Sequence, residues 1–305
     1  MASQSHSCKT LATLTGLLLV GAGAQAQDAK FSAELSAGVI ADSEVGLADL
    51  DQATSEGDIA SLLGLKLDAE VTPVSRLTLR AGYELSDTRY QDFDAFNLQI
   101  HRVSAEAEYE FGATRAGLLY NHVDARLAGD GYLTFQQASP YVMHMFGDQF
   151  LLRGAYARSE RDFDTEPGRN SSSNEFLVDG FFLLDGSQRY LVLGGKAGET
   201  QAENDAFSYD NAGIKARYVH RANALGREMQ FRLGTEFERR SFSGITPEID
   251  SRREDDIFGA SGGVMIPIAG PLSVDAGYEY RGRSSNLPAA DYQAHIATVQ
   301  LKLNF

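Results

Sequence analysis

Three carboxylates recur at every second position in one short stretch of the chain. Glu106, Glu108 and Glu110 alternate there with alanine and tyrosine residues. Because successive side chains of a β-strand point to opposite faces, the carboxylates share one face and the apolar residues the other. Such a strand does not suit the core of a water-soluble sandwich, but it suits lipid on one side and water on the other. The pattern therefore indicates ordering of water and ions along a lumen rather than bond breaking.

Charged residues of both signs occupy equivalent positions in other alternating segments, and we assign them to the lumen face. Facing ladders of opposite sign would create a transverse field that selects polar or charged solutes. Alternatively, the side chains pair with one another and close the lumen. A wider set of lumen bases includes Arg158. The candidates for lumen lining and selectivity are Arg80, Glu84, Glu106, Glu108, Glu110, Arg153, Arg232, Glu236, Glu238 and Arg281.

Segment 41–58 concentrates acidic residues, and we treat it as an acidic loop. Clustered carboxylates are ligands for hard divalent cations. However, the segment starting Asp49-Leu-Asp51 does not fit a calcium-binding EF-hand loop, because Thr54 stands where the turn glycine belongs. We therefore favour a solvated mouth that repels anions and tolerates lipopolysaccharide through bridging cations. The acidic residues of this loop are Asp42, Glu44, Asp49, Asp51, Glu56 and Asp58.

The histidines do not form a catalytic or metal-binding arrangement. An enzyme of the hydrolase kind needs a nucleophile, a base and a group that orients the base. No pair of histidines has metal-ligand spacing, and no glycine-rich phosphate loop precedes a helical pattern. The sequence thus predicts no enzyme, no cofactor and no metal site. Beyond the leader described below, the histidines lie singly on different segments, at His101, His122, His144, His220 and His295.

The elements that carry these side chains read as successive strands without helical periodicity. The alternation predicts about 14 strands in an all-β, antiparallel, up-and-down transmembrane barrel. It slips in the sixth and tenth strands, and such slips can mark bulges. Short connections alternate with longer ones, as expected for periplasmic turns and external loops. The expected strands lie near 31–39, 63–71, 77–84, 103–111, 114–125, 132–146, 149–159, 174–184, 188–198, 206–221, 227–240, 253–267, 272–281 and 292–305.

The first residues have the layout of a secretory signal peptide. Lys9 precedes an apolar run from Leu11 to Ala24, and Ala24-Gln-Ala26 is a small-x-small cleavage site. We expect residues 1–26 to be removed and 27–305 to form a single barrel domain. Cys8 would leave with the leader, so the mature chain would lack cysteine. The net charge of −15 argues against nucleic acid as a partner.

The last strand carries a resemblance to a known class of proteins. Val299, Leu301, Leu303 and Phe305 alternate with polar residues, and the aromatic ring of Phe305 is the last side chain of the sequence. This pattern resembles the C-terminal assembly signal of Gram-negative outer-membrane β-barrels. The resemblance implies export across the inner membrane, recognition by the barrel-assembly machinery, and a final place in the outer membrane in contact with lipid and lipopolysaccharide.

The C-terminal third also faintly resembles the barrel of surface lipoprotein assembly modifiers. The matching stretches are Arg253-Glu-Asp255, Tyr278-Glu-Tyr280 and Ser285-Asn286. That family has a helical repeat domain ahead of its barrel, and this chain shows none. We therefore expect a porin-like channel for small hydrophilic solutes with a weak preference for cations. The alternatives are a barrel that exports or displays a macromolecule, and a non-conducting structural or adhesive barrel. The solute and the oligomeric state are left open.

Overall fold

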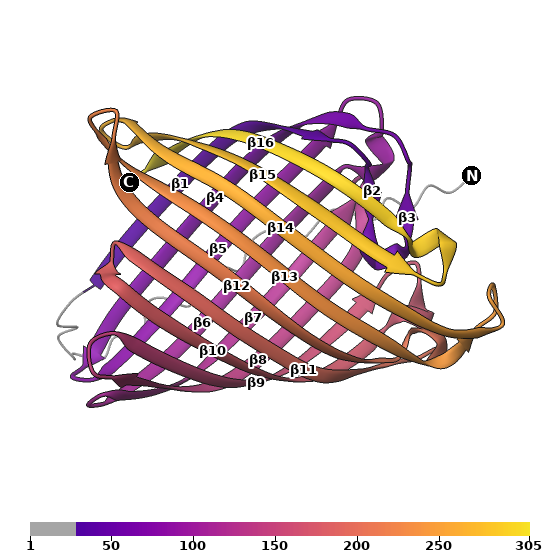
Figure 1. Ribbon diagram of the computed structural model, residues 1–305, viewed down its shortest axis with the longest axis horizontal. Helices are drawn as coiled ribbons and strands as arrows, with labels where there is room; N and C mark the ends of the chain where they lie inside the picture. The colour runs from indigo at the N-terminus through magenta and orange to yellow at the C-terminus, as the bar shows by residue number, and fades with distance from the viewer. Residues whose placement is uncertain (1–28) are drawn as a thin grey trace, which may run out of the picture.

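The computed structural model describes residues 29–305 and shows a closed barrel of 14 antiparallel strands (Figure 1). Each strand pairs with its neighbours along the chain, and β1 (Ala29–Asp42) pairs with β16 (Tyr292–Asn304) to close the ring. Closure gives every strand two partners, so no edge is left unpaired. The fold class and the number of strands expected from the alternation are confirmed. The expected signal peptide, residues 1–26, lies outside the described residues.

The remaining elements follow in chain order. The other barrel strands are β4 (Asp58–Val74), β5 (Leu77–Tyr90), β6 (Leu98–Phe111), β7 (Thr114–Leu127), β8 (Asp130–Phe146), β9 (Phe150–Phe163), β10 (Ser171–Ser187), β11 (Arg189–Ala202), β12 (Tyr209–Ala224), β13 (Arg227–Thr246), β14 (Ser251–Ala269) and β15 (Leu272–Ser285). Two short strands and five short 3-10 helices lie in connections: β2 (Gly46–Leu47), β3 (Gln52–Ala53), η1 (Ala48–Leu50), η2 (Asp94–Phe96), η3 (Pro167–Arg169), η4 (Asp205–Phe207) and η5 (Pro288–Ala290). Among the described residues, no helix is long and apolar enough to cross a membrane.

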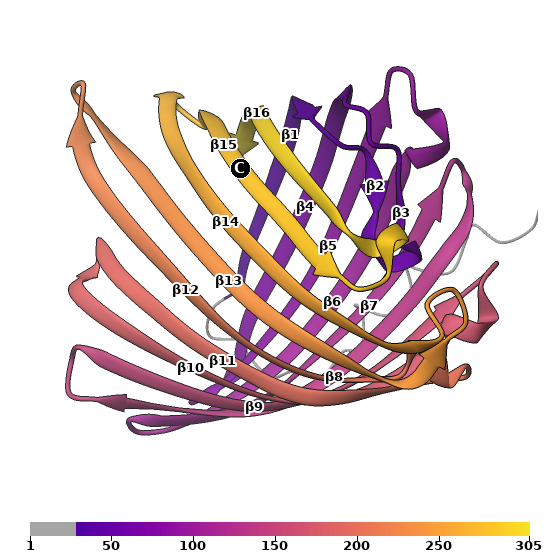
Figure 2. The same cartoon turned by 45° about the vertical axis from the view of Figure 1, so that its right-hand side comes forward.

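The barrel has a turn end and a loop end. Tight turns join β4 to β5, β6 to β7 and the later pairs at the turn end, where Phe305 also lies. Longer connections lie at the loop end, except for the turn at 128–129. The longest is loop L1 (residues 43–57), which joins β1 to β4 and contains β2, η1 and β3. Figure 2 shows β2 and β3 inside the ring of strands near the loop end.

Several strands continue further toward the loop end than the alternation indicates. β5 extends to Tyr90 and β9 to Phe163, and β9 stays in register with β8 up to the pair Leu133 and Phe163. Polar side chains replace apolar ones on the outer face of these extensions, for example at Asp87. The alternating signal therefore stops where the strand leaves the apolar layer, although backbone pairing continues.

The two slips in alternation have different causes. In the sixth strand, β8, the register with β7 shifts so that Tyr132 has no directly opposite residue. This bulge places the Tyr132 ring against Phe163, with ring centroids 5.8 Å apart. The tenth strand, β12, keeps an unbroken register with both neighbours. There the slip arises because Val219 is buried on the lumen side, so the suggestion of a bulge in this strand is wrong.

The outer face of the barrel is apolar, as a lipid-facing surface must be. Its large exposed side chains include Phe31, which is 75% exposed, and Ile214, which is 68% exposed. The four residues of the expected assembly signal, Val299, Leu301, Leu303 and Phe305, also point outward and are exposed. Arg158 does not line the lumen as expected, because it bonds to Asn174 on the outer face.

Glycines on the inner wall leave room for large side chains from neighbouring strands. An added Cβ at Gly117 of β7 would lie 2.5 Å from the ring and hydroxyl of Tyr141, and 2.8 Å from the carbonyl oxygen of Ala107. At Gly194 of β11 it would overlap the side chains of Lys215 and Asp179. These glycines let charged and phenolic side chains lie flat along the wall rather than fill the lumen.

We predict that Gly117→Val destabilises the barrel, because the new side chain must displace Tyr141 from its place on the wall. Overpacking of this kind costs about 1–3 kcal/mol. The measurement is the thermal or urea unfolding of the purified protein in detergent. Gly154→Val is the matched control, because an added Cβ at Gly154 meets nothing within 4 Å. Equal stability of the two variants would contradict the prediction.

Candidate functional site

A ladder of ion pairs runs around the inner wall from β4 to β6. Arg80 of β5 donates from Nε to Glu70 at 2.9 Å and from Nη1 to Glu106 at 3.1 Å. Glu108 lies 3.8 Å from both Arg80 and Arg115. The candidates Arg80, Glu106 and Glu108 thus meet on the lumen face. Each charge is held by partners on adjacent strands, which keeps it on the wall.

The ladder continues through Tyr141 of β8. The Tyr141 hydroxyl approaches Glu106 at 2.5 Å and Glu108 at 2.9 Å, and it bridges these two carboxylates. The guanidinium of Arg153 lies over the Tyr141 ring, 4.8 Å from its centroid, and reaches Asp179 at 3.7 Å. Lys215 bonds to the other oxygen of Asp179 at 2.9 Å. Polar contacts therefore link strands from β4 to β12.

Strands β11, β13 and β15 carry separate, smaller groups of paired charges. Glu238 accepts from Lys196 at 2.6 Å and from Arg240 at 2.7 Å. Arg232 donates to Asp275 at 2.5 Å, and Arg281 donates to Glu279 at 2.5 Å. The candidates Glu84, Glu110 and Glu236 also face the lumen, but they form no ion pair with any described residue.

Two adjoining cavities lie along the wall from β12 to β15, at the lumen side. One has a volume of about 330 Å³ and the other about 350 Å³, and Arg217, Gly234, Ser261 and Glu279 line both. Glycines and Ser261 among the lining residues leave room for these two cavities beside the charged side chains of the wall.

Loop L1 crosses the lumen at the loop end. Its Leu50 packs on an apolar patch of the inner wall formed by Ala125, Tyr132, Phe163 and neighbouring leucines. Val45 is fully buried at the base of L1, where its backbone N–H donates to the carbonyl of Glu56 at 3.0 Å. Two small cavities, of about 60 and 80 Å³, lie beside L1 in the described part of the mouth. L1 therefore narrows the mouth.

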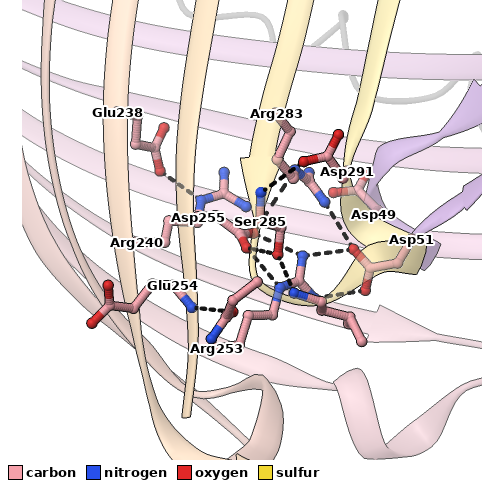
Figure 3. Close-up of polar contacts among 12 residues, drawn as sticks. Asp49, Asp51, Glu238, Arg240, Arg253, Glu254, Asp255, Arg283, Ser285 and Asp291 are labelled. Atoms are coloured by element: carbon pink, nitrogen blue, oxygen red, sulfur yellow. Dashed lines mark hydrogen bonds and ion pairs between the residues drawn. The ribbon is translucent and has the colours of Figure 1, made fainter. Parts of the chain in front are cut away.

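Asp51, next to the tip of L1, meets three arginines, which we call the arginine cluster: Arg169, Arg253 and Arg283. Figure 3 shows Asp51 between Arg253 and Arg283. The carboxylate of Asp51 accepts from Arg253 at 2.8 and 2.9 Å, from Arg283 at 2.8 Å and from Arg169 at 3.0 Å. Asp255 neutralises Arg253 from the wall through bonds of 2.8 and 2.7 Å.

The arginine cluster keeps Asp51 ionised. Burial alone would raise the pKa of Asp51, but the hydrogen bonds and positive charges of the three arginines lower it below its ordinary value. A carboxyl with a lowered pKa contributes stability above its ordinary pKa, and this contribution is lost only as the pH falls through the lowered value. The bond between L1 and the wall is therefore intact at neutral pH.

The other residues of the acidic loop are dispersed. Asp58 accepts backbone N–H groups of Asp92 and Phe93, and Asp42 accepts the N–H of Glu44 and the hydroxyl of Tyr90. The carbonyl of Asp49 accepts from Arg169 at 2.9 Å. Within residues 29–305 no three metal-ligating side chains gather at one place. L1 thus presents an arginine-bound carboxylate inside the mouth and not only the solvated acidic surface that its composition indicates.

The alternation identifies the wall ladders, but not the arginine cluster. Arg253 and Arg283 lie on strand extensions beyond the apolar layer, and Arg169 lies in a loop. A charge surplus in L1 facing unassigned arginines on the late strands is the only signal of the cluster in the sequence. The five histidines lie on the outer face, where His101, His144 and His295 bond to neighbouring hydroxyls.

Comparison with known proteins agrees with this geometry. Neither a protein-family model nor a curated protein sequence matches the chain. Several solved structures match the chain. OmpT expressed in the outer membrane of Vibrio cholerae has a TM-score of 0.53 at 11% identity, over 91% of this chain and 97% of that chain. The fold is that of outer-membrane β-barrels.

Two further barrels of similar size are named for transport. The CymD monoaromatic hydrocarbon channel has a TM-score of 0.52 at 10% identity, covering 90% of this chain and 88% of that chain. An anion-selective porin from Comamonas acidovorans has a TM-score of 0.51 at 8% identity, covering 91% and 99%. At these identities the likeness concerns the fold, and it is consistent with contact between the outer face and membrane lipid.

We predict that Arg80→Gln increases cation preference in a conducting barrel. The substitution leaves Glu70, Glu106 and Glu108 without their shared counter-ion. Removal of one charge about 4 Å from a passing ion changes the energy of that ion by about 1 kcal/mol in water. The cation preference should therefore change by at most roughly fivefold at low salt. The reversal potential in a KCl gradient measures the change. Arg239→Gln, on the outer face beside Asp256, alters net charge equally and should leave the potential unchanged.

Proposed function

We propose that the protein is an outer-membrane pore for small hydrophilic solutes, weakly preferring cations, with the loop end outside the cell and the turn end in the periplasm. One observation carries the proposal: the adjoining cavities of about 330 and 350 Å³ on the lumen side of β12–β15, beside walls whose charged side chains are held flat by cross-strand pairs. A barrel of 14 strands lies between filled eight-stranded barrels and open porins of 16 to 18 strands. Its lumen therefore suits small polar solutes rather than macromolecules.

The charge distribution supports the cation preference. The chain has a net charge of −15, and the lumen carboxylates Glu84, Glu110 and Glu236 have no ion-pair partner among the described residues. Two of the three positive charges of the arginine cluster are compensated by Asp51 and Asp255. At physiological salt such fields act over about 8–10 Å, so the preference is weak.

The outer face supports assembly in a lipid bilayer. Val299, Leu301, Leu303 and Phe305 form an apolar row on β16 and at its end, which the barrel-assembly machinery would read during insertion. Polar side chains on the loop-end extensions would lie among lipopolysaccharide headgroups. The proposal assigns no catalytic role to any residue.

Planar-bilayer recording of the purified protein is the direct test of pore function. We predict discrete conductance steps and a reversal potential that indicates modest cation preference, declining as salt concentration rises because the field is screened. Heat-denatured protein in the same detergent is the control for detergent artefacts.

Two outcomes would contradict the proposal in different ways. A complete absence of steps from correctly folded protein would favour a barrel for export or adhesion. A clear anion preference would show that lumen arginines such as Arg153, Arg217 and Arg232 dominate the narrowest point. Swelling of liposomes in neutral sugars gives an independent estimate of the size of solute admitted.

A further inference from the structure

The arginine cluster binds one of the protein's own carboxylates as it would bind a separate anion. Both Nη atoms of Arg253 donate to Asp51, one to each carboxylate oxygen, which is the bidentate geometry that arginine forms with free carboxylates. Arg283 and Arg169 add one donor each. Four donors thus meet two oxygens, which matches the acceptor capacity of an ionised carboxylate.

The barrel and its other loops fix the planes of the three guanidinium groups, and Arg169 also donates to the carbonyl oxygens of Asp49 and Leu50 in L1. The guanidinium of Arg169 lies over Phe207 at 4.1 Å, that of Arg253 over Phe242 at 4.6 Å, and that of Arg283 over Tyr292 at 5.4 Å from the ring centroid. Stacking on an aromatic face fixes the plane of a guanidinium and the direction of its donors. The arginines therefore keep their arrangement when Asp51 leaves.

The charge of the cluster without Asp51 calls for an anion. The three arginines contribute three positive charges, and Asp255, the wall carboxylate that Arg253 contacts, contributes one negative charge. The Arg253 and Arg283 side chains are only 4% and 5% exposed. Counted over these three arginines, Asp51 and Asp255 alone, one positive charge is in excess with Asp51 in place and two are in excess without it. Partly buried charge of this kind is costly unless it is compensated.

Asp51 is a replaceable ligand because it lies on a loop. In L1 the strands β2 and β3 are joined through only two residue pairs. The tip is held by the side chains of Leu50 and Asp51 and by the bonds from Arg169 to the carbonyls of Asp49 and Leu50. Asp51, Arg253 and Arg283 are only 7%, 4% and 5% exposed, so an entering solute reaches them as the tip of L1 lifts. A carboxylate of the solute can take the place of the Asp51 carboxylate without any change in the wall.

We propose that the arginine cluster is a binding site for small organic anions with one or two carboxylates, and that Asp51 is its built-in competitor. Binding of such a solute releases the tip of L1 and widens the mouth. The inference rests on the proposed pore only for its biological role, because binding itself requires just the folded barrel. Two carboxylates would match the two excess charges that remain when Asp51 leaves.

The first test compares succinate with succinamide, a neutral molecule of similar shape, by isothermal titration calorimetry in detergent. Asp51→Asn should bind succinate at least tenfold more tightly than the unaltered protein, because the competitor is removed. Asp49→Asn is the matched control, since it removes the same charge from the same loop but its side chain forms no ion pair with a described arginine. Addition of Arg253→Gln to Asp51→Asn should abolish the gain.

Two results would overturn the proposal. One is equal affinity of the unaltered protein and Asp51→Asn for succinate, which would make the cluster a structural clamp only. The other is an equal gain from Asp49→Asn, which would indicate attraction by overall charge without a site. Succinamide should bind none of the variants.

A second test needs no substitution and decides the matter even when Asp51→Asn does not fold. Hydrogen–deuterium exchange of amides in 44–56 should become faster in the unaltered protein as succinate is added, and succinamide should have no effect. Exchange that is unchanged or slower with succinate would refute displacement of L1. Both tests are independent of conductance, so succinate binding by a non-conducting barrel would refute the pore and leave this site intact.

Discussion

The pairing of Asp51 with Arg253 and Arg283 is the interaction on which the shape of the mouth depends. These side chains are 7%, 4% and 5% exposed, respectively. Removal of one partner from a buried ion pair typically costs about 3–5 kcal/mol, because the remaining charge is left uncompensated. L1 is a long connection with little secondary structure, and its internal hydrogen bonds alone are too few to hold it across the lumen. The ion pairs at one side and Leu50 at the other fix it there.

Much of the remaining lumen wall follows a related rule, in which large polar groups have space and partners on adjacent strands. Gly117 makes room for Tyr141, which in turn bridges Glu106 and Glu108. Because these contacts run around the wall, they compensate charge without carrying side chains into the centre. On β12–β15 glycines and Ser261 lie among the charged residues, and the two larger cavities of the wall lie beside them. Permeation and binding thus take place at different levels of the barrel. Permeation uses the wider part beside the wall of β12–β15, and binding uses the narrow mouth.

Much of the barrel could be predicted from the sequence, because lipid on one face and water on the other impose a period of two on every strand. That period indicates the strand count and places residues such as Glu106 and Arg232 on the lumen face. The period of two is lost where the strands leave the apolar layer, because lipid no longer covers one face. On the loop-end extensions both faces are polar, so the alternation understates the length of β9. Arg158 is assigned to the lumen by its charge, whereas strict alternation from Arg153 places it on the outer face, as observed. The arginine cluster joins residues separated by more than a hundred positions, and only the path of L1 brings them together. A loop's path depends on a few specific contacts, which leave no periodic trace.

The central claim is that a water-filled barrel is narrowed by one inward-folded loop. Its most direct measurement is the single-channel conductance of the protein compared with that of a variant in which residues 45–55 are replaced by a short glycine–serine link. The account predicts a severalfold higher conductance for the variant, since the mouth cavities beside L1 are far smaller than those along the wall. Equal conductance of the two folded proteins would contradict it, because the narrowest point would then lie elsewhere in the barrel.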